Sequence, residues 1–124
     1  MAQVGKAHLL ITFVAPAAKV PEIDRLVASH GAWMAETHHR SGPKALLSYS
    51  FSKGPELSSP LDPSSAPDGS TRYVLSEVYE SAAGIQEHWE QAQNSWRDFG
   101  AMTAIIGQCN AQTLHGGTIL QSLW

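Results

Sequence analysis

The sequence predicts one α+β domain in which helices cover one face of a four-stranded antiparallel sheet. Three observations lead to this fold class. A chain of 124 residues is long enough for one hydrophobic core and short for two domains. Its apolar residues follow either strand patterns or the 3.6-residue period of helices. These patterns succeed one another as β-α-β-β-α-β, which is a recurring motif of single domains.

The first half of the chain predicts a strand, a helix and a second strand. Residues 7–15 are apolar at nearly every position and end at a proline, as in a strand buried on both faces. Pro21 suits the first turn of a helix, whose pattern fades near residues 41–43. Residues 45–52 alternate between large apolar side chains and serines, which is the period of a strand.

The middle of the chain predicts a long loop and a third strand. Residues 54–70 are rich in serine, proline and acidic side chains, which is typical of a solvated loop. Residues 72–80 alternate again, with tyrosine, leucine and glutamate on one side and valine and serine on the other. We therefore expect a third strand that follows a loop with little contribution to the core.

Ser81 marks the start of the second helix, because its side-chain oxygen suits an N-cap. Helical spacing then places one apolar and aromatic stripe on the buried side of this helix. The stripe contains Ile85, His88, Trp89, Ala92 and Trp96. The helical signal continues from Phe99 to Gly107, and residues 108–120 predict the fourth strand, with a bulge at Gly116–Gly117.

Charge and composition argue against several classes of function. Eight Lys and Arg residues are scattered among eleven Asp and Glu residues, so the sequence predicts no nucleic-acid partner. No apolar run approaches the roughly 20 residues that span a bilayer, so no membrane association is expected. Cys109 is the single cysteine, and we expect it to be a small buried residue.

The start of the chain has two interpretations. Lys6, the apolar run after it and the small residues after Pro16 imitate a secretory signal. The apolar run is short, however, and it is dense in residues that favour strands. We therefore expect a buried first strand in a cytoplasmic protein, with a signal peptide as the alternative.

The first three strands predict a partner for the sheet. Apolar side chains occupy both faces of these strands, as Leu9 and Leu10 illustrate in the first. The helices can cover only one face, so the other face requires a second layer. A twofold homodimer is the simplest solution, because a single patch then covers itself.

A family resemblance lies in the third strand and second helix. Residues 72–81, RYVLSEVYES, and residues 85–89, IQEHW, resemble the dimeric α+β barrel proteins, above all the antibiotic biosynthesis monooxygenase family. The resemblance implies a ferredoxin-like domain over residues 1–124, a homodimer whose two sheets form a barrel, and a ligand pocket between sheet and helices. The implied activity is cofactor-independent oxygenation of a small aromatic or polycyclic compound. The alternative is a non-catalytic small-molecule-binding or stress-response protein of the same fold.

The chain differs from the phenol-oxidising members of this family at their functional positions. Those members have Trp, Asn and Tyr at the positions of Tyr79, Leu75 and Ile85. Of these features only an aromatic ring is retained, at Tyr79. The differences favour the non-catalytic alternative or an oxygenation that uses substituted groups.

The candidates for catalysis are His88, Glu77 and Tyr79. An imidazole on the buried stripe of a helix can act as a general base near neutral pH. Glu77 shares its strand face with tyrosine and leucine side chains, where an unpaired carboxylate is costly. The alternative roles are structural: a core histidine satisfied by hydrogen bonds, and a carboxylate that pairs with Arg72, His88 or a dimer mate.

Apolar and aromatic residues on the strands and the second helix predict a pocket for a flat ligand, with ordinary core packing as the alternative. The candidate ligand-binding residues are Tyr49, Tyr73, Leu75, Ile85, Trp89 and Trp96. We expect no cofactor and no metal, since the chain has neither a glycine-rich phosphate loop nor the HExxH spacing. The adjacent His38 and His39 face different ways and are expected to serve the negative end of the first helix.

Overall fold

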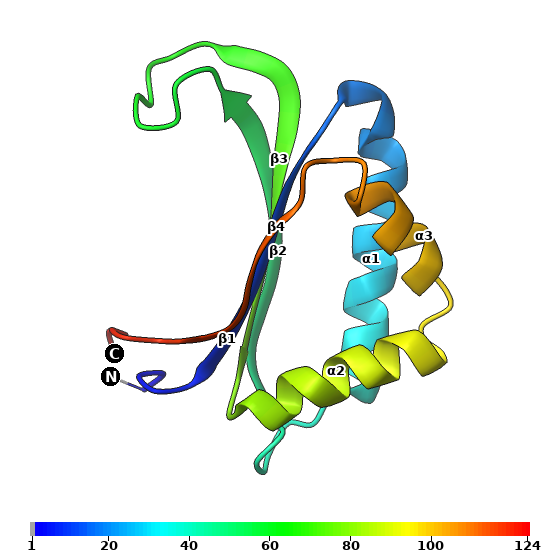
Figure 1. Cartoon of the computed structure of the whole chain (residues 1–124), viewed down its shortest axis with the longest axis vertical. Helices are drawn as coiled ribbons and strands as arrows, with labels where there is room; N and C mark the ends of the chain where they lie inside the picture. The colour runs from blue at the N-terminus through cyan, green and yellow to red at the C-terminus, as the bar shows by residue number, and fades with distance from the viewer. Residues whose placement is uncertain (1) are drawn as a thin grey trace.

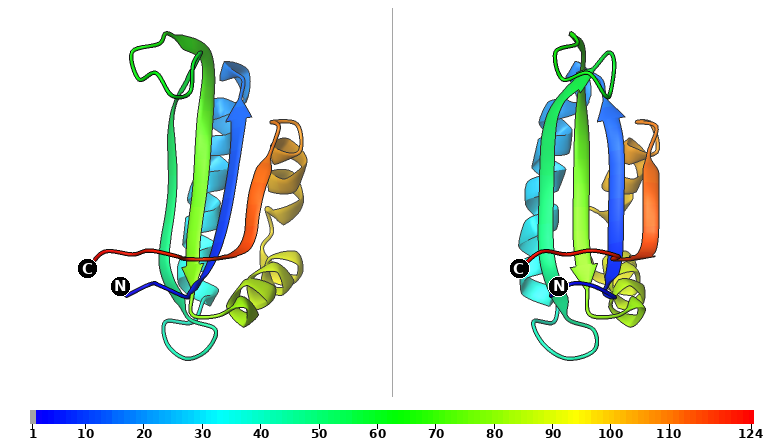
Figure 2. Two further views of the ribbon diagram at one scale, coloured as in Figure 1. Left: turned by 60° about the vertical axis from the view of Figure 1, so that its left-hand side comes forward. Right: turned by 90° about the vertical axis from the view of Figure 1, so that its left-hand side faces the viewer.

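The computed structural model describes residues 2–124 as an open antiparallel sheet of four strands with three α-helices on one face (Figures 1 and 2). The elements are β1 (Ala7–Ala15), the short 3-10 helix η1 (Ala17–Lys19), α1 (Val20–Thr37), β2 (Leu46–Leu57), β3 (Pro67–Tyr79), α2 (Ala82–Ser95), α3 (Phe99–Ile106) and β4 (Gln112–Thr118). The strand order is β2-β3-β1-β4. The predicted α+β class and antiparallel sheet are confirmed, and the arrangement is consistent with a ferredoxin-like fold.

Strand β1 lies at the centre of the sheet, between β3 and β4. Its residues alternate, so that Leu9, Ile11, Phe13 and Ala15 are buried under the helices and the residues between them are half-buried. The continuous apolar run predicts that β1 is buried on both faces, but within one chain only the face under the helices is fully buried. The half-buried side chains between Leu9 and Ala15 lie on the face of the sheet without helices.

The connection between β2 and β3 is shorter than the sequence predicts. Strand β2 continues to Leu57 and β3 begins at Pro67, so both ends of the expected loop at residues 54–70 belong to strands. Arg72 fixes the extension by donating two hydrogen bonds to the Glu56 carboxylate, at 2.8 and 2.7 Å. Residues 58–66 remain as the loop. The serines and prolines misled the prediction because pairing between the consecutive strands β2 and β3 overrides local polarity.

The helix boundaries agree with the sequence in position but not always in mechanism. Helix α2 begins directly after Ser81, yet the Ser81 hydroxyl does not cap it and instead donates to the carbonyl of Pro43 at 2.6 Å. Gly107 ends α3 as predicted. The expected bulge is present, since Gly117 pairs with His8 while His115 pairs with Leu9, which leaves Gly116 unpaired at a φ of 80°.

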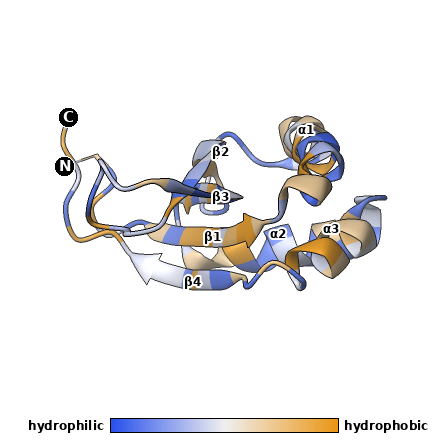
Figure 3. Cartoon of the chain, turned by 90° about the horizontal axis from the view of Figure 1, so that it is seen from above, coloured by the Kyte–Doolittle hydropathy of each residue, from blue (hydrophilic) through white to orange (hydrophobic). Residues whose placement is uncertain are grey.

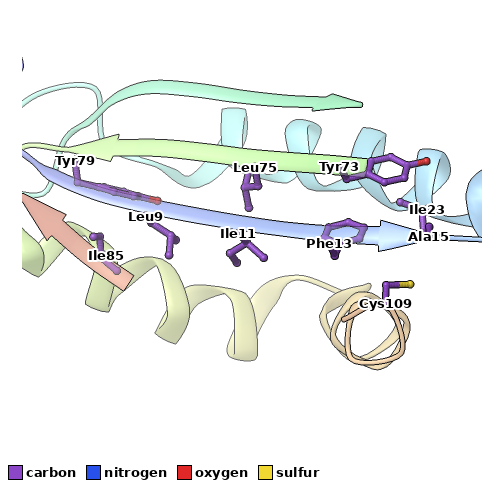
Figure 4. Packing of buried hydrophobic residues seen from close by; sticks show 10 residues of the cluster. All are labelled: Leu9, Ile11, Phe13, Ala15, Ile23, Tyr73, Leu75, Tyr79, Ile85 and Cys109. Carbon is purple, nitrogen blue, oxygen red and sulfur yellow. The ribbon is translucent and has the colours of Figure 1, made fainter. Parts of the chain in front are cut away.

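Two clusters of buried side chains hold the helices on the sheet. The first joins β1 and β3 to α1 and α2 (Figure 4) and contains Cys109, which is 2% exposed, as expected for a small buried residue. The second lies between the three helices and consists of Leu26, Trp33, Met34, Ala92, Trp96 and Met102. The helices are therefore fixed against each other as well as against the sheet.

The helix-free face of the sheet is open and bordered at both ends (Figure 1). The β2–β3 connection bends toward this side at one end, and both chain ends extend from it at the other. Backbone hydrogen bonds between Gly5 and Ile119 and between Ile119 and Lys6 pair the segments next to the two ends. Seen from above, β1 is largely apolar and β4 is mostly intermediate in hydropathy (Figure 3). The half-buried residues of β1, which alternate with those under the helices, include both apolar and polar side chains, such as Leu10 and Thr12.

Candidate functional site

Three polar side chains are buried together in the interior: His30 of α1, Glu77 of β3 and His88 of α2. They are 4%, 0% and 3% exposed. Strand alternation places Glu77 on the helix side of the sheet, opposite Tyr49 of β2 and Leu9 of β1. The apolar stripes of the two helices bring the histidines onto it. We call His30, Glu77 and His88 the buried cluster.

Glu77 is the centre of the buried cluster, and its two oxygens have different surroundings. Oε1 accepts a hydrogen bond of 2.5 Å from the Tyr79 hydroxyl and lies 3.7 Å from Nδ1 of His88. Oε2 lies 3.9 Å from Nε2 of His30, which is too far for a hydrogen bond, and has no other partner within residues 2–124. A buried carboxylate oxygen without a partner is costly in structural terms and points to a functional role.

Burial controls the protonation of the buried cluster. Removal from water raises the pKa of Glu77 to about 7, although the hydrogen bond from Tyr79 opposes the shift. Burial likewise lowers the pKa of His30 to about 4 and that of His88 to about 3, and neighbouring histidines add to both shifts. Both imidazoles are therefore neutral at pH 7, and Glu77 exchanges its proton close to that pH.

A chain of hydrogen bonds fixes the tautomer of His88. The Thr37 hydroxyl donates its single hydrogen to the Trp33 carbonyl at 2.8 Å, so it accepts from Nδ1–H of His38 at 2.9 Å. Burial lowers the pKa of His38 to about 4, so this ring is neutral and its Nε2 is an acceptor. Nδ1 of His88, at 2.8 Å, must then be the donor. The Nε2 lone pair of His88 is left free.

A small cavity of about 50 Å³ adjoins the buried cluster on the helix side of the sheet. Its walls come from β1, β3 and the three helices: Ile11, His30, Leu75, His88, Trp89, Ala92, Trp96, Phe99, Met102, Thr103 and Ile106. The volume suits a few water molecules or a small compound, and a typical pocket for a drug-sized ligand is several times larger. The indole N–H of Trp89, one of these lining residues, is buried without a hydrogen-bond partner in the described chain.

The structure brings the three candidate catalytic residues together. His88, Glu77 and Tyr79 contact one another around Oε1 of the carboxylate. Of the candidate ligand-binding residues, Leu75, Trp89 and Trp96 line the cavity. Tyr49 does not line the cavity, but its hydroxyl lies 2.7 Å from Nδ1 of His30, which does.

Besides Tyr49, two further candidate ligand-binding residues, Tyr73 and Ile85, lie outside the cavity wall. Tyr73 stacks on Phe13, with ring centroids 5.1 Å apart, and its hydroxyl donates to Asp24 at 2.7 Å. Ile85 belongs to the core cluster of β1 and β3 (Figure 4). The strand and helix patterns correctly predicted that both side chains are buried. Both residues lie elsewhere along β3 and α2, away from the cavity.

The sequence analysis missed His30 and His38 as members of the site. His30 lies at helical spacing on the apolar stripe of α1, and a titratable residue on such a stripe is a signal that could have identified it. His38 was expected to serve the end of α1, but its ring turns inward to His88. The exposed His39 instead pairs with Glu87, with Nε2 and Oε2 2.7 Å apart.

Comparisons with protein-family models and with curated proteins find no match to this chain. Within residues 2–124, none of the helices has both the length and the apolar character needed to cross a lipid bilayer.

Proposed function

We propose that the protein is an enzyme of the dimeric α+β barrel type that oxygenates a small aromatic compound in the internal cavity without flavin or haem. The observation that carries this proposal is the neutral His88, which has a free Nε2 lone pair, lines an aromatic-walled cavity and lies 3.7 Å from the buried Glu77 carboxylate. A base, a proton acceptor and a flat apolar wall are what the removal of a proton from such a compound requires.

The reaction begins with an activated C–H or phenolic O–H group held near His88. Burial holds the pKa of His88 at about 3 when no substrate is bound, so Nε2 accepts the proton only as the ionised Glu77 and the forming substrate anion stabilise the imidazolium. The resulting anion is electron-rich enough to react with O₂, and the imidazolium returns its proton to the peroxide. For an activated methylene group, the peroxide formed on carbon then collapses to a carbonyl group and water. O₂ supplies both oxygen atoms and the substrate supplies all the electrons, so the reaction needs no external reductant.

Neighbouring residues position the base. His38 holds Nδ1 of His88 and keeps the tautomer in which Nε2 is a base. Glu77 lies 3.7 Å from the same ring and stabilises the imidazolium that forms when His88 accepts a proton. Trp89 offers its free indole N–H to an oxygen of the bound compound.

The small cavity favours a second candidate function, which is binding of a small molecule without catalysis. A volume of about 50 Å³ does not admit a polycyclic compound unless the surrounding side chains move. Leu75 and Ile85 also replace the polar and aromatic groups used by phenol-oxidising relatives of the barrel type. A single aromatic ring occupies a cavity of about 150 Å³, so a one-ring compound requires the least movement of the wall and is the substrate class we propose.

The proposal includes a homodimer formed through the helix-free face. Leu10, Val14 and Val74 lie half-buried on this face, between polar side chains. The C-terminal segment exposes further apolar side chains at Leu120, Leu123 and Trp124. A second copy would cover these apolar groups, and the twofold axis would let the same patch serve both chains.

Oxygen uptake distinguishes the two candidate functions. The purified protein is incubated under air with one-, two- and three-ring phenols and activated methylene compounds, and dissolved O₂ is followed with an electrode. We expect uptake with a one-ring compound, a loss of at least tenfold in His88→Gln, and little change in His39→Gln, which alters an exposed histidine. Binding of a compound without O₂ uptake would support the non-catalytic candidate, and uptake that persists in His88→Gln would contradict the assigned base.

A further inference from the structure

The buried cluster has the composition of a metal site, although the sequence predicts none. One atom from each of His30, Glu77 and His88 lies within 4.8 Å of the other two. Two imidazoles and one carboxylate are the ligand set of catalytic zinc sites and of non-haem iron sites, which keep further positions open for water or substrate. We propose that the buried cluster binds one divalent transition-metal ion. This inference goes beyond the oxygenation proposed above and does not require a substrate.

Each of the three side chains has a hydrogen-bonded partner on the atom that the ion would not use. The Tyr49 hydroxyl is 2.7 Å from Nδ1 of His30, and the Tyr79 hydroxyl donates to Oε1 of Glu77 at 2.5 Å. His38 lies on Nδ1 of His88 at 2.8 Å. Such partners fix the orientation of ligands in protein metal sites, and the acceptors on the two Nδ1 atoms also raise the basicity of the imidazoles.

The remaining atoms are free to bind the ion. No hydrogen bond within residues 2–124 uses Nε2 of His30 or of His88. Oε2 of Glu77 is fully buried and unpartnered, and it is 3.9 Å from Nε2 of His30. Ligand atoms about 2.1 Å from a tetrahedral ion lie roughly 3.4 Å apart, so the three side chains, which offer atoms within 4.8 Å of one another, move closer together when the ion binds.

The cavity next to the buried cluster supplies the open side of the site. Its volume of about 50 Å³ holds water ligands without a change in the fold. A divalent ion balances the Glu77 carboxylate and satisfies the oxygen that otherwise has no partner. With an ion bound, His88 would be a ligand and not a free base, and the ion would supply Lewis-acid chemistry at this site.

Metal binding is measured on untagged protein that has been treated with a chelator and dialysed. Co²⁺ is titrated while its visible absorption is recorded, and Zn²⁺ is added afterwards to displace it. We expect one Co²⁺ per chain, displacement by Zn²⁺, and binding at least tenfold weaker in His30→Gln, Glu77→Gln and His88→Gln. His39→Gln is the matched control, because His39 and Glu87 form an exposed pair that could bind an ion adventitiously.

A second variant keeps the test decisive if a ligand variant fails to fold. Tyr49→Phe retains all three ligands and removes only the partner of His30, so we expect it to fold and to bind Co²⁺ about 10- to 100-fold more weakly. Absence of stoichiometric binding, unchanged binding in Glu77→Gln, or loss of binding in His39→Gln would overturn the proposal. Oxygen uptake by chelated protein that binds no Co²⁺ would refute the metal site alone, and stoichiometric binding without uptake would refute the oxygenase alone.

Discussion

Replacement of Glu77 by glutamine tests whether the buried carboxyl group holds a proton in the folded protein. Glu77 is 0% exposed, and burial raises its pKa from an ordinary value of 4.5 to about 7. A raised pKa in the folded state contributes stability that is complete below pH 4.5 and is lost as the pH rises through 7. The difference between the ordinary pKa of 4.5 and the pKa of about 7 in the folded protein corresponds to about 3 kcal/mol of unfolding free energy, at about 1.36 kcal/mol per pKa unit.

The measurement is urea unfolding of the wild type and Glu77→Gln at pH 5 and pH 8, with a chelator present. Glutamine does not ionise, so the wild type should lose about 2 to 3 kcal/mol relative to the variant between these two pH values. Titration of the histidines occurs in both proteins and cancels in the difference. A difference in unfolding free energy that is the same at pH 5 and pH 8 would refute the assigned protonation of Glu77.

Three further predictions concern packing, the loop and assembly. Gly84→Ala should lower the unfolding free energy by about 1 to 2 kcal/mol, because a Cβ there would lie 2.7 Å from the buried Tyr79 ring and 3.0 Å from the Lys44 carbonyl; unchanged urea stability would contradict this packing. Replacing residues 58–66 by a two-residue Asn-Gly turn should lower the unfolding free energy, measured by thermal melting, by less than about 1 kcal/mol; a larger decrease would mean that the loop packs against another part of the protein. The protein should elute near twice its chain mass of 13.4 kDa, and a monomer at micromolar concentration would exclude the barrel.

Local patterns predicted the elements best where one segment determines its own structure. The apolar run at residues 7–15 coincides with β1, and the stop at Gly107 coincides with the end of α3. The prediction of a loop at residues 54–70 was wrong at both ends, because these polar residues extend the pairing of β2 with β3. Gly54, for example, lies opposite Arg72. Strand pairing of this kind depends on the partner strand and leaves little trace in composition.

The candidate site shows the same division between local and distant information. The alternation of β3 and the stripe of α2 were enough to place Glu77 and His88 in the interior. The contribution of His30 depends on which turn of α1 crosses the sheet at Glu77, and that of His38 on a ring that turns inward from the end of α1. Both are consequences of how helices dock, which a helical period alone does not determine.

The three residues of the buried cluster come from α1, β3 and α2, so the site exists only when both helices are seated on the sheet. Any ion or compound that binds there recognises the native state and not the unfolded chain. Occupancy is therefore linked to the global folding equilibrium, and a ligand at 100 times its Kd would add about 2.7 kcal/mol to the unfolding free energy. The melting temperature of the whole domain would then report on what the interior holds, which makes a thermal-shift screen of ions and small aromatic compounds a direct route to the natural ligand.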